Sequence, residues 1–210
     1  MYRPAHFDVP DPGELHALVR AARVAHLVTH TAEGFDSSVL PLLLDPDAGA
    51  LGHLVGHWAK ANPQWHDLHG REALAIFTLP DAYISPSGFA TKAETGKVVP
   101  TWNYTVVHAH GIVRVHEDPA WLGDMVRSLT DHYEAARSAP WSVDDAPADY
   151  IQRSLLRIVG IELEITRLEG KAKLSQNRTP ADIAGAVADL RGGSERDRAV
   201  ADAMAAAAPS

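Results

Sequence analysis

The chain has 210 residues, of which 46% are hydrophobic and 22% are charged, with a formal net charge of −8 and no cysteine. Lack of cysteine excludes disulfides, a thiolate nucleophile and thiolate metal sites. The net negative charge gives the chain as a whole no excess of basic residues, which binding to nucleic acid requires. No apolar run approaches the roughly 20 residues of a membrane span, and the first residues lack a signal-peptide pattern. We therefore expect a soluble, cytoplasmic protein with no membrane partner.

The N-terminal half predicts one helix followed by short antiparallel strands. Asp11 is typical of a helix N-cap, with Pro12 at the first helical position and apolar residues at helical spacing after it. Turn residues then separate short apolar runs, which favours hairpins. The expected elements are a helix over Pro12–Arg23, strands over Ala25–Thr31, Phe35–Leu44 and Ala50–Gly56, a short helix over His57–His69, and strands over Ala73–Leu79 and Asp81–Pro86.

The C-terminal half predicts two further strands and more helix. Residues 87–99 suggest a mobile loop, and alternation in the long strand that follows puts His108 and His110 on one face. We expect the closing Ala205–Ser210 to be disordered. The expected elements are strands over Val106–His116 and Gly160–Leu168 and helices over Pro119–Arg137, Ala148–Leu156, Thr179–Arg191 and Ser194–Ala208.

This order of elements indicates a mainly antiparallel β protein with flanking helices, of the α+β class. It lacks the repeated βαβ units of a parallel sheet. A small β-barrel with helices packed around it fits the pattern.

Residues 98–111 combine a rigid entry at Pro100 with two large aromatics, Trp102 and Tyr104. Amide, hydroxyl and imidazole groups stand between and after the rings. Flat apolar surface beside a few directed polar groups suits a planar ligand. The alternative is a strand edge with core aromatics.

Two other stretches could hold an anion. Residues 56–65 follow a predicted strand, so a helix start there would offer free N–H groups with Lys60 as a point charge. Residues 170–178 concentrate three cations and three neutral polar side chains, which can bind phosphate and polyol hydroxyls. The alternatives are a solvated helix with two packing tryptophans and an exposed basic turn.

Metal binding and acid–base catalysis have weaker support. The 12 histidines include the pairs His53/His57 and His108/His110, but a pair needs a further ligand nearby. The chain has no G-x-S-x-G, no G-x-G-x-x-G and no P-loop. We assign no metal ligand and no catalytic residue.

Several motifs together resemble the PaiB-type FMN-binding negative transcriptional regulator family. They occur in the family's order over about residues 1–190, and together they are specific. The matching pieces are the opening Met-Tyr-Arg-Pro-Ala-His-Phe, Gly56-His57 through Asn62-Pro63-Gln64-Trp65, Asp81-Ala82-Tyr83-Ile84-Ser85-Pro86-Ser87, Val99-Pro100-Thr101-Trp102-Asn103-Tyr104, Val107-His108 and Lys173-Leu174-Ser175-Gln176-Asn177-Arg178. One departure stands after the Ile-Ser-Pro-Ser turn, where the family's aromatic pair is replaced by Gly88-Phe89.

The resemblance implies an FMN-binding split β-barrel that forms a homodimer, with FMN in clefts at the subunit interface. Residues 1–178 would form this domain with its N-terminal helix, and residues 179–210 a C-terminal helical extension packed on or trailing from it. The implied FMN-binding residues are His57, Lys60, Asn62, Trp102, Asn103, Tyr104, His108, Lys173, Ser175, Gln176, Asn177 and Arg178.

The chemistry of these side chains suggests which part of FMN each of them would bind. Lys60 and either Lys173 or Arg178 would neutralise the phosphate, Trp102 would wall the isoalloxazine, and amides and hydroxyls would bond the ribityl chain or ring edge. The alternatives are a flavin-dependent oxidoreductase (flavin reductase or pyridoxamine-phosphate oxidase-like) and a haem- or metal-binding relative. Direct DNA binding, which the family name suggests, has little support because no basic recognition helix is evident.

Overall fold

The computed structural model describes residues 1–208. Its strands are β1 Asp8–Val9, β2 Ala25–Thr31, β3 Gly34–Leu40, β4 Leu43–Asp45, β5 His53–Ala59, β6 Glu72–Ile84, β7 Thr101–His116 and β8 Ile158–Lys173. Its α-helices are α1 Pro12–Ala21, α2 Ala90–Thr95, α3 Pro119–Glu134, α4 Ala148–Leu155, α5 Pro180–Arg191 and α6 Glu195–Ala206, and its 3₁₀ turns are η1 Ala5–Phe7, η2 Pro63–Trp65, η3 Pro86–Gly88 and η4 Val143–Asp145.

The strands form one eight-stranded sheet in the order β3-β2-β6-β7-β8-β5-β4, with β1 paired to β8. The pairings of β2 with β3 and β6, of β5 with β4 and β8, and of β1 with β8 are antiparallel. The predicted class, mainly antiparallel β with flanking helices, is confirmed.

The described chain divides into two compact units. Unit 1 comprises Met1–Leu18, Thr78–Val107 and the described residues from Glu169 onward, and unit 2 comprises Val19–Phe77 and His108–Leu168. The chain passes between them at four points, within α1, β6, β7 and β8.

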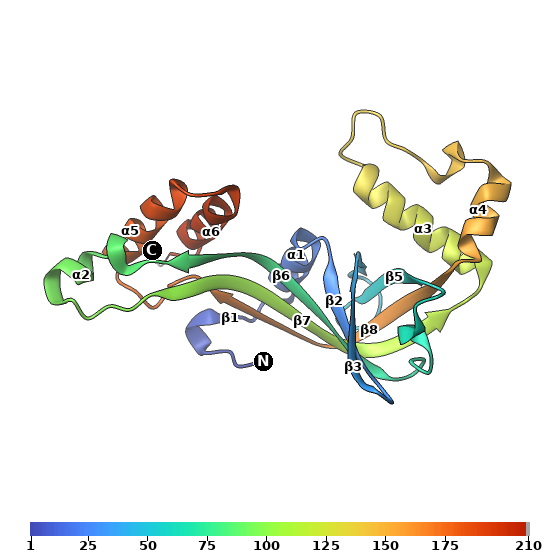
Figure 1. Ribbon diagram of the computed structural model, residues 1–210, viewed down its shortest axis with the longest axis horizontal. Helices are drawn as coiled ribbons and strands as arrows, with labels where there is room; N and C mark the ends of the chain where they lie inside the picture. Colours follow the sequence, from blue (N-terminus) through green and yellow to red (C-terminus); the bar gives the residue numbers. More distant parts are fainter. Residues whose placement is uncertain (209–210) are drawn as a thin grey trace. The chain divides into compact units, whose positions relative to one another are not determined.

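Unit 1 has a core in which the C-terminal helices pack on the end of β6. Figure 1 shows α5 and α6 side by side, with α2 near α5. The backbones of η3 and α5 meet at two glycines, because a Cβ on Gly185 would lie 1.8 Å from the Gly88 carbonyl oxygen. The buried cluster consists of Ala82, Ile84, Phe89, Leu174, Ile183, Ala186, Val187, Leu190, Val200, Ala201 and Met204.

Unit 2 has its core between the strands, with α3 and α4 forming a smaller cluster. Alternation along β5 buries Leu54 and Trp58, and their strand neighbours on β8 include Leu163 and Val159. Leu122 and Met125 of α3 pack with Leu155 of α4. The helical spacing of these apolar residues thus corresponds to buried faces.

Several predicted elements are confirmed, and others are wrong at prolines and turns. The strand Ala25–Thr31 has the predicted bounds, and Asp11 accepts a hydrogen bond from the Glu14 N–H at 2.8 Å, as an N-cap should. The predicted strand Phe35–Leu44 is interrupted around Pro41. The third strand begins three residues later than expected, because residues 46–51 form a bend and a turn with positive φ at Gly49.

The helix predicted over His57–His69 is wrong. Residues 57–59 continue β5 and pair with residues 158–160 of β8. Pro63 then starts the 3₁₀ turn η2, where Asn62 accepts a hydrogen bond from the Gln64 N–H. Proline in a helix interior removes a hydrogen bond and clashes with the preceding turn, so the segment cannot continue as an α-helix.

The two strands predicted on either side of Pro80 are one strand, β6. Within β6, only Ala73–Ile76 pair with β2, so no hydrogen bond to β2 needs the N–H that Pro80 lacks. The loop predicted over residues 87–99 contains η3 and α2, and Gly96 closes α2 with φ +67°. Pro209 and Ser210, in the tail predicted to be disordered, lie outside the described residues, whereas Ala205 and Ala206 belong to α6.

Candidate functional site

Unit 1 presents an exposed aromatic surface on β6 and β7. The side chains of Trp102 and Tyr83 are 55% and 49% exposed, and their ring centroids lie 5.8 Å apart at an interplanar angle of 66°. A hollow of about 340 Å³ lies beside them, lined in part by Leu79, Trp102 and Tyr104. The predicted stretch around Trp102 therefore offers flat apolar surface to a ligand rather than filling the core.

Lys173 lies against the same stretch. Its Nζ donates hydrogen bonds to Thr101 Oγ1 at 2.5 Å and to the Trp102 carbonyl, and it stands 5.9 Å from the Tyr104 ring centroid. Burial lowers the pKa of Lys173, and the charges of Lys171 and Arg178 lower it further. Lys173 and residues 102–104, which belong to two separately predicted stretches, thus lie in contact within unit 1.

Asn103 and Ser175 form a buried pair. Asn103 is fully buried, and its Nδ2 donates to Ser175 Oγ at 2.9 Å, while that hydroxyl lies 3.2 Å from Asn103 Oδ1. Ser175 has a φ of +68°, which is uncommon for a residue with a side chain. The pair holds the turn that follows β8, so these two residues position their neighbours.

The remaining predicted residues of this turn differ in their exposure. Gln176 bonds within the turn, accepting from the Leu174 N–H and donating to the Ala172 carbonyl. Asn177 is exposed, and the Arg178 guanidinium lies 5.4 Å from the Phe89 ring centroid. Of these three residues, Asn177 is therefore the one whose side chain is exposed to a ligand.

Lys171 is one of the three cations in the predicted stretch 170–178, but it was not among the predicted FMN-binding residues. Its side chain is packed between two tyrosines, with Nζ 5.5 Å from the Tyr2 ring centroid and 5.4 Å from that of Tyr104. The strand was predicted to end at Leu168, but it continues to Lys173 through pairing with β1. Extending the alternation would have put Lys171 and Lys173 on one face.

Lys60 and Asn62, in unit 2, are tied into local contacts. Lys60 Nζ lies 2.6 Å from Glu117 Oε2 in a half-exposed ion pair. Asn62 Oδ1 accepts from the Gln64 N–H at 2.9 Å, and its Nδ2 donates to Ser38 Oγ at 3.0 Å. Asn62 is thus a cap for η2, and the charge of Lys60 is already offset by a carboxylate.

His57 is a half-buried residue of β5. Its Nδ1 is buried and has no hydrogen-bond partner among residues 1–208. Burial lowers the pKa of His57, which favours the neutral imidazole at pH 7. A neutral, unsatisfied ring nitrogen can accept or donate one hydrogen bond but adds no charge to a phosphate site.

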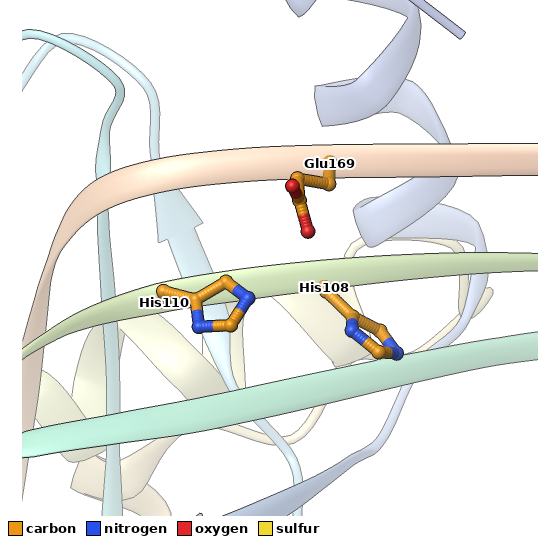
Figure 2. A group of neighbouring side chains, drawn as sticks. All are labelled: His108, His110 and Glu169. Carbon is orange, nitrogen blue, oxygen red and sulfur yellow. The ribbon is translucent and has the colours of Figure 1, made fainter. Parts of the chain in front are cut away.

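His108 and His110 share one face of β7, as alternation predicted. Figure 2 shows both imidazoles projecting from the strand, and their ring centroids are 6.1 Å apart. The same view labels Glu169 of β8, a unit 1 residue whose carboxylate lies 3.1 Å from the Met1 ammonium and 3.6 Å from Arg3. The assignment of no metal ligand stays a prediction.

Unit 2 contains a hollow of about 480 Å³ beside Pro63 and Gln64. Three carboxylates line it, from Glu33, Asp36 and Asp67, against the single guanidinium of Arg71; the other lining residues are His30, Thr31, Ala32, His66 and Leu68. This lining repels a phosphate, because like charges disfavour one another at close range. The cationic part of the candidate site is therefore in unit 1.

Comparison with known proteins agrees with this picture. The family described as "Putative FMN-binding domain" matches residues 1–167. The chain is 29% identical over 192 residues to "Protease synthase and sporulation protein PAI 2" of Bacillus subtilis, covering 91% of this chain and 89% of that protein. It is 36% identical over 195 residues to an uncharacterized protein of Aspergillus fumigatus, covering 72% of this chain and 74% of the relative.

Solved structures share the fold at low sequence identity. The FAD and heme binding protein from Mycobacterium smegmatis has a TM-score of 0.60 at 17% identity, covering 84% of this chain and 78% of its own. The flavocytochrome Anf3 from Azotobacter vinelandii has a TM-score of 0.61 at 16% identity, covering 95% and 78%. The predicted split-barrel fold is confirmed.

The matched family covers residues 1–167, which include the aromatic stretch of β7. The similarity to the Bacillus protein extends over 91% of this chain. FMN, the predicted cofactor, is confirmed as the ligand of this family. This chain belongs to the FMN-binding domain family and is a PaiB-type homologue.

Proposed function

We propose that the chain forms a homodimer and binds FMN in a cleft at the subunit interface. The exposed Trp102 ring next to Lys173 is the observation that supports this most strongly, because FMN joins a flat apolar ring system to a phosphate. The flavin would supply the redox chemistry, and the protein would bind, orient and shield it.

The proposed roles follow the contacts. Trp102 walls the ring system, and Tyr104 and His108 lie along the same strand, β7. Asn177 presents its exposed amide to the ribityl chain or ring edge. Asn103 and Ser175, being buried, act by holding the turn, while Gln176 bonds the same turn from within.

In unit 2, Asn62 supports η2 by capping it. His57 offers one unsatisfied ring nitrogen. Lys60 can reach a ligand only by leaving Glu117, and such an exposed ion pair is worth only about 0–1 kcal/mol.

We also propose that residues 1–178 form the flavin-binding domain and that the described residues from Thr179 onward are a helical extension packed on it. Contacts within unit 1 support this. Thr91 of α2 bonds Asp182 of α5, and α5 meets η3 at Gly185 and Gly88. On this proposal the extension steadies the segment that leads into β7.

The relatives support flavin chemistry in general terms. Two fold relatives are described as an FAD and heme binding protein and as a flavocytochrome. The name of the Bacillus relative connects that protein with protease synthesis and sporulation. For this chain we propose a regulatory role that does not rest on broad DNA contact, since its net charge is −8.

Flavin uptake tests the main proposal directly. The purified protein is titrated with FMN while flavin fluorescence and absorbance are followed, and its mass in solution is measured by light scattering. We expect saturable binding of one FMN per chain and a dimeric mass. Lack of any spectral change at millimolar FMN would overturn the proposal. A gel shift on the protein's own upstream DNA, over a range of salt, tests direct DNA binding separately.

A further inference from the structure

Lys171 is a buried cation whose Nζ is paired with two aromatic rings in the described part of the chain. Its residue is 9% exposed, and its Nζ lies over the faces of Tyr2 and Tyr104. Aromatic faces attract an ammonium but do not neutralise it. No carboxylate lies within ion-pair distance of Lys171 among residues 1–208, so a buried positive charge is left without a counterion.

The acids nearest along the sheet are engaged by other cations. Asp8 is the cross-strand partner of Lys171, but its carboxylate pairs with the Arg3 guanidinium. Glu169, two residues before Lys171 on β8, faces the Met1 ammonium at 3.1 Å and Arg3 at 3.6 Å. These contacts direct both carboxylates to the N-terminal segment.

Lys173 adds a second positive charge on the same face of β8, two residues beyond Lys171. Both ammonium groups lie within 6 Å of the Tyr104 ring centroid, at 5.4 and 5.9 Å. Lys173 uses hydrogen bonds to Thr101 and to the Trp102 carbonyl, which leaves one of its three N–H groups for a ligand.

The other cations considered for the phosphate are less suitable. Lys60 pairs with Glu117 at 2.6 Å. Arg178 lies over Phe89 and acts electrostatically on Asp182, a carboxylate of the next helix. Lys171 and Lys173 thus combine proximity to each other, partial burial and lack of a carboxylate partner within the described chain.

We propose that Lys171 and Lys173 together bind the phosphate monoester of FMN. This inference rests on the proposed function and assigns its phosphate end, which the sequence left open between several cations. A phosphate monoester carries about −1.5 to −2 charges at neutral pH, which two ammonium groups balance. The free N–H groups of Lys171 supply the charge-assisted hydrogen bonds that such a ligand needs.

Titration with FMN and with riboflavin, which lacks the phosphate, tests the assignment. We expect Lys171→Met to weaken FMN binding on the order of 10- to 100-fold and to leave riboflavin binding unchanged. Lys171→Arg, which keeps the charge, should restore much of the FMN affinity. Lys97→Met, at an exposed lysine of the same unit, is the matched control and should bind both flavins as the wild type does.

Each result decides between the two ideas. Equal FMN affinity of Lys171→Met and wild type would overturn the phosphate assignment and leave FMN binding intact, and so would an equal loss for both flavins in folded protein. If wild type binds no flavin, the proposed function fails. In that case the melting temperatures of wild type and Lys171→Met are compared with and without inorganic phosphate. Stabilisation of wild type but not of Lys171→Met supports an anion site at Lys171, and lack of stabilisation of wild type overturns that site.

Discussion

Thr91 donates two hydrogen bonds to the carboxylate of Asp182, from its backbone N–H to Oδ1 at 2.9 Å and from its hydroxyl to Oδ2 at 2.8 Å. The Asp182 side chain is thereby satisfied although the residue is only 2% exposed. These bonds connect α2, which precedes β7, with α5, which follows the turn after β8. They hold together the two helices that lie next in sequence to the strand β7 and to the turn after β8, which carry candidate ligand-binding residues.

Removing the Asp182 carboxylate should destabilise the protein. Asp182→Ala leaves the Thr91 N–H and hydroxyl without their acceptor, and we expect a loss of about 1–3 kcal/mol in the free energy of unfolding. Urea denaturation followed by circular dichroism measures it. Asp189→Ala, an exposed position in the same helix, should change stability by no more than about 0.5 kcal/mol. Equal effects of the two substitutions would mean that these bonds contribute nothing.

The close approach of α5 to η3 predicts an unusual response to Gly→Ala. Alanine at Gly185 would place Cβ 1.8 Å from the Gly88 carbonyl oxygen, whereas alanine at Gly123 of α3 would meet only Leu155, at 3.8 Å. Both sites are helical, so both substitutions gain up to about 1 kcal/mol of helix propensity. We expect Gly123→Ala to raise the melting temperature and Gly185→Ala to lower it. Stabilisation by Gly185→Ala would contradict the tight packing.

The family's aromatic pair becomes Gly88-Phe89 here, and the structure gives the physical reason for both residues. Gly88 admits the backbone of α5, and Phe89 is 4% exposed in the unit 1 core, with Arg178 over its ring. Neither reason could be found in the sequence, because both depend on a helix almost one hundred residues away.

The sequence predicted the local features of the fold better than their extent. Alternation placed His108 and His110 on one face of β7, and the cap at Asp11 located α1. The errors occurred where pairing with a distant strand determines how far a strand extends. Pairing with β1 extends β8 through Lys171, and pairing with β8 makes residues 57–59 part of β5. The prediction of the site was affected for the same reason, because Lys171 was expected in a loop, where strand alternation assigns no face.

Glu162 of unit 2 predicts a pH-dependent contribution to stability. Burial opposes its ionisation, but hydrogen bonds with His53 Nδ1 at 2.6 Å and His116 Nε2 at 2.9 Å outweigh burial and hold the pKa of Glu162 below its ordinary value. A carboxyl with a lowered folded-state pKa stabilises the protein above its unfolded pKa, and that stabilisation is lost as the pH falls through the folded pKa.

We therefore expect Glu162→Gln to lower the free energy of unfolding by about 1–2 kcal/mol at pH 7, and the difference from wild type to shrink as the pH falls to about 3. Denaturant titrations at several pH values measure this. Glu164→Gln, two residues along β8, breaks a more exposed pair with Arg114 and should cost about 0–1 kcal/mol. A difference for Glu162→Gln that stays constant or grows in acid would contradict the argument.

Substitution of Trp102 tests whether its ring forms a wall of the flavin site or is part of the core. Its side chain is 55% exposed, so Trp102→Ala removes little buried surface and should leave the melting temperature nearly unchanged. If the ring system of FMN packs on it, the same substitution should raise the Kd for FMN roughly tenfold and affect riboflavin equally, since the phosphate is not involved. Trp141→Ala, at a tryptophan that is 46% exposed in unit 2, is the matched control and should bind both flavins normally. Unchanged flavin affinity in folded Trp102→Ala would show that the ring does not contact the cofactor, and residues 98–111 would then serve the sheet alone.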